Sequence, residues 1–456
     1  MRSDTIHALA SGTPPAGVAV IRVSGPLVPT LIADWIARPL PPRRATLVTL
    51  RGGDGAVLDE VLAIHFPNPR SFTGEDVLEL HCHGGPAVVR AVGERLTMLG
   101  CRPAEAGEFT MRAHANGRID LIEAERLAGL IEAETEAQRR FAASDRGRRL
   151  YKLYEGWRTG LLHARALIEA SLDFADEEDA PADVTTEVEW LLNGIVRTMR
   201  DHLTAGRHRE IVTHGLRVAL AGPPNAGKSS LLNALAAREA AIVTDVPGTT
   251  RDVIEVALDL HGHRIVLSDT AGLRDTDDAV ERIGVDRARE RIARSDCVLW
   301  LEPPGSDAPL PDVAAHTACV RVATKSDLLD RASVPPPDAA GTDAIVISTL
   351  SGEGLETLAR RLADIAQNAA PPEGVETPLT ARQDHHLARA LEPIAAVVEG
   401  HVDGNHRGAG IRGQLVIDER LAEAVRIAAD ELGRITGATD MEDVYGAIFS
   451  RFCMGK

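Results

Sequence analysis

A glycine-rich segment at residues 222–229 has the composition and spacing of a phosphate-binding loop. Its sequence, GPPNAGKS, matches GxxxxGK[ST], follows the apolar run RVALA and precedes the helix-like run SSLLNAL. Glycines let backbone N–H groups curl around a β-phosphate, Lys228 would bridge β- and γ-phosphate oxygens, and Ser229 would offer its hydroxyl to Mg²⁺. The order of strand, loop and helix favours a nucleotide site over a chance match.

Residues 324–327 (TKSD) identify the expected base. The segment follows the strand-like run TACVRVA and resembles the NKxD element, in which Asp327 would accept hydrogen bonds from guanine N1 and N2. Thr324 stands in place of Asn, and we expect its hydroxyl to replace part of the amide's role. The alternative is a turn that only caps a helix, but Lys325 is one of only four lysines among 50 Lys and Arg residues. Ser348 begins a small-residue loop, STLSGEG, which is expected to close on the base.

Two further segments predict the metal and γ-phosphate contacts of a GTPase. Asp269 ends the run RIVLS and would hold Mg²⁺ through water, while the amide of Gly272 would reach the γ-phosphate. Residues 248–252 (GTTRD) supply Thr250 as a second Mg²⁺ ligand. Together, these five elements in their order and spacing along the chain predict a GTP hydrolase.

The position after DTAG is Leu273, so the glutamine that orients water in Ras-like enzymes is absent. Candidates for that role lie in the acidic stretch that follows, although a solvated loop is the alternative for most of them; they are Arg274, Asp277, Asp278 and Glu281. A positive charge opposite the transition state is also required, from an arginine finger or from a bound monovalent cation.

Four segments of different periodicity must position these residues. Residues 1–118 contain short β-like runs at 17–23, 46–50 and 57–66, which predict an α+β domain. Residues 119–212 have helical spacing of apolar side chains, and residues 213–374 alternate strands with helices, as a parallel α/β sheet requires. Helical spacing returns over residues 375–456. We therefore expect an α+β domain and an all-α domain whose halves flank an inserted α/β P-loop (Ras-like) G domain.

Composition narrows the classes of function. The chain has 456 residues, with 50 Lys and Arg against 67 Asp and Glu, a net charge of −17, which argues against a large nucleic-acid surface. Its five cysteines include no CxxC pair, so we expect reduced thiols in the cytoplasm rather than disulfides or a zinc ribbon. The sequence has no signal segment and no apolar run of about 18 residues, so we expect neither secretion nor a membrane span.

Seven blocks of sequence, spread over essentially the whole chain, resemble the MnmE (TrmE) family of tRNA-modifying GTPases. Their order and number make the resemblance specific, whereas the GTPase motifs alone would not. The blocks are DTIHALASGTPPAGVAVIRVSG, SFTGEDVLELHCHGG, GEFTMRAHANGRIDLIEAE, GPPNAGKSS, DVPGTTRD, DTAGLR with VERIG, and IFSRFCMGK.

The resemblance implies a K⁺-dependent hydrolysis. Asn225 would help to hold K⁺ where an arginine finger would otherwise lie, with oxygens of Thr244, Val246 and Thr249 completing the site. Glu281 would orient the water, and the G domains of two subunits would dimerise across their nucleotides. With Lys228 and Ser229, the implied GTP contacts are Asn225, Ala226, Gly227, Ser230, Thr244, Asp245, Val246, Pro247, Gly248, Thr249, Thr250, Asp269, Thr270, Ala271, Gly272, Thr324, Lys325, Asp327 and Ser348.

The resemblance also implies a folate-binding N-terminal domain that forms a constitutive dimer. Contacts with 5-formyltetrahydrofolate or a related folate would fall on Arg22, Glu79 and Arg118, the last being a position where relatives often have Lys. Guanidinium groups suit folate carboxylates, and a carboxylate suits the amino-pyrimidine edge of the pterin. Cys453 in the tail FCMGK would lie near this site and contribute to modification, and Lys456 ends the tail; a buried small hydrophobe is the alternative for Cys453.

The resemblance implies that the protein forms a heterotetramer with the MnmG flavoprotein and that this complex modifies C5 of the wobble uridine in certain tRNAs. FAD and NADH would be bound only by MnmG. An aminomethyl or carboxymethylaminomethyl group is installed, with the folate as the one-carbon source and GTP turnover as the conformational fuel. Two alternatives stay open: a ribosome-assembly or signalling switch, and a stand-alone folate-dependent aminomethyltransferase with a regulatory G domain.

Local tRNA contact is expected at a basic stretch formed by Arg139, Arg140, Arg146, Arg148, Arg149 and Lys152.

Overall fold

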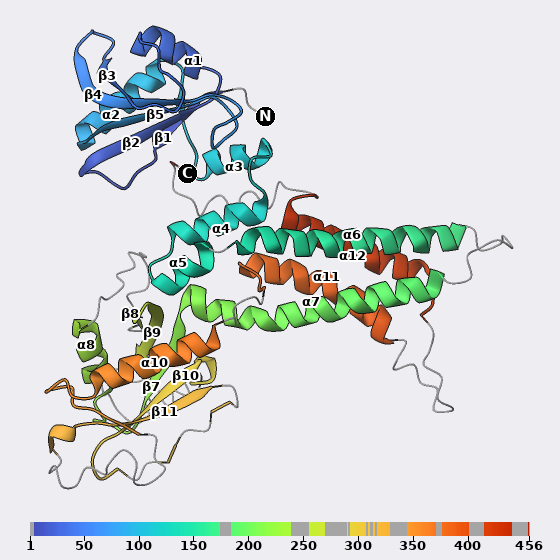
Figure 1. Ribbon diagram of the computed structural model, residues 1–456. Helices are drawn as coiled ribbons and strands as arrows, with labels where there is room; N and C mark the ends of the chain where they lie inside the picture. The colour runs from blue at the N-terminus through green and yellow to red at the C-terminus, as the bar shows by residue number, and fades with distance from the viewer. Residues whose placement is uncertain are drawn as a thin grey trace, which may run out of the picture. The chain divides into compact units, whose positions relative to one another are not determined.

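The computed structural model divides the chain into two compact units (Figure 1). One comprises Met1–Ala128, Tyr151–Val196 and Thr380–Lys456, and the other Gly129–Leu150 with Arg197–Leu379. The predicted domain boundaries after residues 118, 212 and 374 stay predictions. The structure describes residues 4–143, 145–173, 184–238, 255–269, 290, 292–306, 309–310, 313–314, 317–328, 344–370, 376–400, 415–439 and 455.

The N-terminal part of the first unit is a six-stranded sheet in the order β3-β4-β5-β2-β1-β6. Neighbouring strands are antiparallel except for β1 and β6. Leu78 and Leu80 of β5 lie in the core that helix α2 forms over one face, with Val92 and Leu96 of that helix. The bounds are β1 (Ile6–Leu9), β2 (Ala16–Ser24), β3 (Thr46–Arg51), β4 (Val57–Phe66), β5 (Val77–Gly84), β6 (Arg102–Pro103), α1 (Val28–Thr30), the π-helical turn η1 (Leu31–Ile36), α2 (Pro86–Met98) and α3 (Glu108–Ala115).

The other face of this sheet is less covered. Cross-strand partners share a face, and the pairs Leu47–Leu62, Leu62–His81 and Arg22–Glu79 belong to it. Leu47 and Leu62 are 57% and 44% exposed, and Val18 is 54% exposed. Strand alternation therefore places the predicted folate residues Arg22 and Glu79 on a face with exposed apolar side chains.

The helices of the first unit are held together by a buried carboxylate. Glu125 of α4 accepts hydrogen bonds from Arg382 Nε at 2.7 Å and from Gln383 Nε2 at 2.6 Å, both on α11. Tyr154 and Glu155 of α6 contact α11 and α12 through Gln383 and Thr436. The helices are α4 (Leu121–Ile131), α6 (Arg146–Asp173), α7 (Val184–His214), α11 (Ala381–Gly400) and α12 (Glu419–Thr436); α4, α6 and α7 continue into the second unit.

The second unit contains a six-stranded sheet in the order β12-β11-β10-β7-β9-β8. Neighbouring strands are parallel except for β8 against β9, and helices α8 and α10 contribute Leu231, Leu235, Leu358 and Leu362 to its core. The predicted inserted α/β fold is confirmed, as is the α+β fold. The bounds are α5 (Glu136–Ala143), β7 (Leu216–Ala221), α8 (Lys228–Arg238), β8 (Glu255–Leu260), β9 (His263–Asp269), β10 (Cys297–Glu302), β11 (Ala318–Ala323), the 3-10 turn η2 (Ser326–Leu328), β12 (Ile345–Val346) and α10 (Leu355–Ala369).

Helix α5 packs beside the β8–β9 hairpin within this unit. Ala137 N donates to Gly262 O at 2.9 Å, and Glu134 forms an ion pair with Arg264. The basic stretch begins on α5, where Arg139 and Arg140 both pair with Glu136. These pairings offset part of the positive charge that the sequence places there. In the part of the chain that the structure describes, no helix combines the length and apolar character needed to cross a bilayer.

Candidate nucleotide and folate sites

The phosphate loop connects β7 to α8 through backbone conformations that few residues adopt. Gly222 has φ +149°, and a Cβ there would lie 2.5 Å from the Leu301 carbonyl oxygen. Asn225 and Gly227 also have positive φ, at 60° and 96°. Such a turn directs successive N–H groups toward one point, which is how a backbone binds phosphate.

Lys228 is the first residue of α8 and extends back over the loop. Its Nζ donates to the carbonyl oxygens of Gly222 at 2.9 Å and of Pro223 at 3.1 Å. The ammonium therefore lies above the turn, where it would meet phosphate oxygens together with the positive end of the helix dipole. Ser229 follows it in the first turn of α8, and its predicted contact with Mg²⁺ stays a prediction.

Thr324 connects the base-reading segment to the phosphate loop. Its hydroxyl Oγ1 donates to the Ala226 carbonyl oxygen at 2.9 Å, and the residue is 4% exposed. The substitution therefore leaves the two loops joined. That a threonine hydroxyl replaces part of the amide's role in binding guanine stays a prediction.

The carboxylate of Asp327 is oriented by a second loop. Ser348 Oγ donates to Asp327 Oδ1 at 2.6 Å, and Ser348 Oγ accepts from the backbone N–H groups of Leu350 and Ser351 at 3.3 and 3.2 Å. Lys325, within the TKSD segment, has a positive φ of 58°. Because β7, β11 and β12 are parallel, the segments after them meet at one edge of the sheet, where α/β folds bind nucleotides.

Several predicted nucleotide residues cannot be placed in this way. Asp269 is the last residue of β9, beside Leu220 of β7, which puts its backbone at the same edge. The rest lie outside the described residues; they are Thr244, Asp245, Val246, Pro247, Gly248, Thr249, Thr250, Thr270, Ala271, Gly272, Arg274, Asp277, Asp278 and Glu281.

The structure brings Arg22 and Glu79 together on neighbouring strands. Arg22 Nε and Nη2 both lie 3.0 Å from Glu79 Oε1, and the two side chains are 19% and 18% exposed. The Arg22 guanidinium carbon also lies 5.5 Å from the centre of the Phe72 ring and 5.7 Å from that of Phe109. Two aromatic rings and one carboxylate thus define where this cation points.

Arg118 is connected to the same region through the loop at residues 71–76. Gly74 in this loop has φ +81°, and a Cβ there would lie 3.1 Å from Arg118 Cγ. Phe72 of the loop faces Arg22, so one loop contacts two predicted folate residues. Sequence reasoning missed Phe72 and Phe109, although both occur in blocks that carried the family resemblance, SFTGED and GEFTMR.

The chain's penultimate residue lies against this site. The Gly455 carbonyl oxygen is 3.5 Å from Arg22 Nη1, and a Cβ at Gly455 would lie 1.9 Å from the Leu9 carbonyl oxygen. Cys453 and Lys456 lie outside the described residues. Among the described cysteines, burial raises the pKa of Cys82 and Cys297 to about 12 and of Cys101 to about 11, which leaves these thiols unreactive.

The geometry agrees with comparisons to known proteins. The family model "MnmE helical domain" matches residues 121–453, and "GTP-binding protein TrmE N-terminus" matches residues 5–118. The chain belongs to the MnmE family. The MnmE proteins of Mesorhizobium japonicum and Rhizobium meliloti, both named tRNA modification GTPase MnmE, are each 46% identical to it, over 99% and 100% of both chains respectively.

A solved G domain, that of the T. maritima FeoB iron transporter, is 26% identical and covers 33% of this chain and 99% of its own, with a TM-score of 0.24. A score this low carries no argument about arrangement. Membership of the MnmE family therefore depends on the sequence models and the full-length relatives.

The Thr324 hydrogen bond predicts a defined loss of nucleotide affinity. Thr324→Val removes the hydroxyl and leaves the Ala226 carbonyl without that donor, so GDP binding measured by calorimetry should weaken by about 1–2 kcal/mol, or about 5- to 30-fold. Thr324→Ser should bind like the wild type. As a matched control, Thr317→Val removes the buried hydroxyl that donates to Ser295 O at the opposite end of β11. Equal affinities for all four proteins would contradict the role of Thr324.

The close packing of Gly455 predicts that any side chain there displaces the tail. In Gly455→Ala the new methyl group would overlap the Leu9 carbonyl, so carboxypeptidase should release the terminal residues faster than from the wild type. Gly12→Ala is the control, because a Cβ at Gly12 has nothing within 4 Å. Release at the wild-type rate from Gly455→Ala would show that the tail does not pack as described.

Proposed function

We propose that this protein is a K⁺-dependent GTPase that acts with an MnmG-type flavoprotein on the wobble uridine of certain tRNAs. It installs an aminomethyl or carboxymethylaminomethyl group at C5, with a folate as the one-carbon source. The observation that carries this proposal is the likeness over the whole chain to relatives named tRNA modification GTPases. Retention of the nucleotide motifs and of the Arg22–Glu79 pair in one chain supports a shared activity rather than a G domain alone.

The GTPase part of the proposal assigns roles around the phosphate loop. Lys228 contacts the β- and γ-phosphates, and Asp327 with Thr324, Lys325 and Ser348 selects guanine. Mg²⁺ would be held by Ser229 and Thr250. K⁺ would be held by Asn225 with Thr244, Val246 and Thr249, where it supplies positive charge opposite the leaving phosphate. Glu281 orients the water that attacks.

The positive φ of Asn225 supports its part in the K⁺ site, because it belongs to the turn that directs the backbone of the phosphate loop toward the phosphates. The hydrogen bonds from Thr324 to Ala226 and from Ser348 to Asp327 support the choice of guanine. A carboxylate held by a serine hydroxyl keeps its other oxygen directions available to the paired N–H donors of the base.

The folate part assigns Arg22 and Arg118 to the carboxylates of 5-formyltetrahydrofolate and Glu79 to its amino-pyrimidine edge. The partial exposure of Arg22 and Glu79 supports this, since a bound ligand needs access to both groups. The aromatic rings of Phe72 and Phe109 give the region an apolar wall. Cys453 and Lys456 belong to the same FCMGK tail as Gly455, which contacts Arg22, and we assign Cys453 a part in the modification.

The less covered face of the N-terminal sheet supports the proposed assembly into a dimer and a heterotetramer. Leu47, Leu62 and Val18 expose apolar surface beside the folate residues, which supports a homodimer formed through this face. The dimer would bind two MnmG subunits as a heterotetramer, and FAD and NADH enter only through them. We place the protein in the cytoplasm, where tRNA is modified.

The K⁺ proposal predicts that GTP turnover depends on the cation. Turnover in K⁺ should exceed that in Na⁺ at equal ionic strength, and Glu281→Ala should lose about 100-fold or more in rate while still binding GTP. Glu290→Ala, at a side chain that is 60% exposed and forms an ion pair with Arg294 four residues further on, serves as the matched control. Equal rates in the two salts would exclude the K⁺ site.

The folate and tRNA proposals are tested together by calorimetry and mass spectrometry. Glu79→Ala should lose binding of 5-formyltetrahydrofolate, and cells carrying only this variant should lose the wobble-uridine modification. Glu94→Ala, on the exposed side of α2 across the sheet, should behave as the wild type. Intact modification in cells lacking the gene would overturn the proposed function. Intact modification with Lys228→Ala would instead favour a transferase with a regulatory G domain.

A further inference from the structure

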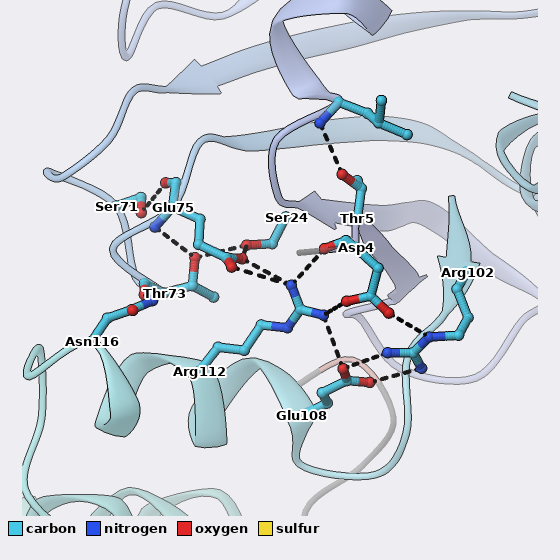
Figure 2. Close-up of polar contacts among 11 residues, drawn as sticks. Asp4, Thr5, Ser24, Ser71, Thr73, Glu75, Arg102, Glu108, Arg112 and Asn116 are labelled. Atoms are coloured by element: carbon cyan, nitrogen blue, oxygen red, sulfur yellow. Dashed lines mark hydrogen bonds and ion pairs between the residues drawn. The ribbon is translucent and has the colours of Figure 1, made fainter. Parts of the chain in front are cut away.

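Arg112 of α3 lies at the centre of a partly buried network of charged side chains in the N-terminal sheet domain (Figure 2). Its Nη2 lies 2.6 Å from Asp4 Oδ1 and 3.0 Å from Glu108 Oε1, and its Nη1 donates to the Asp4 carbonyl oxygen at 2.9 Å. Arg102 pairs with the same two carboxylates from the other side. The side chain of Arg112 is only 7% exposed, so its position is determined by these contacts.

Among the contacts of the described residues, those of Arg112, unlike those of Arg102, also reach the loop at residues 71–76. Arg112 Nη1 lies 3.2 Å from both oxygens of Glu75, and Glu75 Oε2 accepts from Ser24 Oγ at 2.6 Å. Ser24 in turn lies 2.7 Å from the hydroxyl of Thr73. Asn116, at the end of α3, joins the same loop as well by donating to the Thr73 carbonyl oxygen at 2.7 Å. Figure 2 shows Arg112 extending from α3 toward Glu75 and Asp4, which lie on different segments of the chain.

Both elements that Arg112 joins carry an aromatic ring that faces Arg22. Phe72 belongs to the loop, and Phe109 follows Glu108 in α3. Arg22 lies on β2 with Ser24, the strand residue that hydrogen-bonds to Glu75. Moving the loop relative to α3 would therefore move one ring away from Arg22 and release Gly74 from Arg118.

Electrostatics keep the network charged near neutral pH. Burial alone would raise the pKa of Asp4 and Glu108, but hydrogen bonds from Arg102 and Arg112 outweigh it and hold both values below their ordinary range. Burial would lower the pKa of Arg112, but the charge of Glu75 and the bonds to Glu108 and Asp4 raise it overall. Three carboxylates thus share two guanidinium groups, and removing one cation leaves buried negative charge.

We propose that Arg112 is a positioning residue of the folate site: by holding Glu75 against α3, it sets the place of Phe72 and Gly74, and through them the orientation of Arg22 and Arg118. This inference rests on the proposed folate binding. It assigns Arg112 no contact with the ligand, because the side chain is enclosed by Asp4, Glu75 and Glu108.

Arg102 supplies the matched control for a test with the full-length protein. Arg112→Met and Arg102→Met each remove a guanidinium that pairs with Asp4 and Glu108, but only the first releases Glu75. Both should lower the thermal unfolding midpoint of the N-terminal domain, and both should retain the GTPase rate. By calorimetry, Arg112→Met should bind 5-formyltetrahydrofolate about tenfold or more weakly than Arg102→Met, because small misplacements of contact groups are costly.

Two milder variants keep the test valid if Arg112→Met does not fold. Glu75→Gln retains an acceptor for Ser24 and removes the charge that faces Arg112, and it should weaken folate binding several-fold. Arg112→Lys keeps the charge and should restore part of the affinity. A wild-type protein that does not bind the folate overturns the folate proposal and this inference with it. A wild-type protein that binds, alongside Arg112→Met or Glu75→Gln proteins that bind equally, overturns only the positioning role.

Discussion

The carboxylate of Glu125 joins α4 to helices that follow 257 residues later in the chain. Its side chain is 4% exposed, and it accepts hydrogen bonds from Arg382, Gln383 and Thr380. Arg382 also donates to the carbonyl oxygens of Arg434 and Ile435, near the end of α12, which lack partners within the helix. A buried ion pair is favourable only when its polar atoms are satisfied. Here that condition requires α4, α11 and α12 to meet, so these contacts join the two halves of the helical segment within the first unit.

In the N-terminal domain, too, ion pairs between charged side chains join segments that are distant in the sequence. Arg112 joins the segment just before β1, the loop at residues 71–76 and α3 through carboxylates rather than through a large apolar contact. Aromatic residues make up 3% of the chain, and two of them, Phe72 and Phe109, face Arg22. Charged networks are directional, unlike apolar packing, so they fix orientation as well as proximity.

At the nucleotide site, Thr324 stands where the NKxD motif has asparagine, and its hydroxyl makes a hydrogen bond to the phosphate loop. Its short side chain reaches the Ala226 carbonyl, so the loop that reads the base stays joined to the loop that binds phosphate. Asp327 receives its orientation from Ser348, which lies after a different strand. The three loops to which we assign guanine binding thus follow the parallel strands β7, β11 and β12 at one edge of the sheet.

The sequence by itself determined the phosphate loop, the TKSD element, half of the strands of the N-terminal sheet, the strands beside the nucleotide motifs and the family, because each depends on short-range spacing or on a backbone conformation such as that of Gly222. It did not reveal the pairing of Arg112 with Glu75, the rings beside Arg22 or the bonds between Glu125 and Arg382. Those contacts join segments 37 to 257 residues apart. They depend on the strand order β3-β4-β5-β2-β1-β6 and on which helices meet, which local patterns leave open. Only the tertiary structure decided them, because a buried charge selects its partner from whatever the fold places within reach.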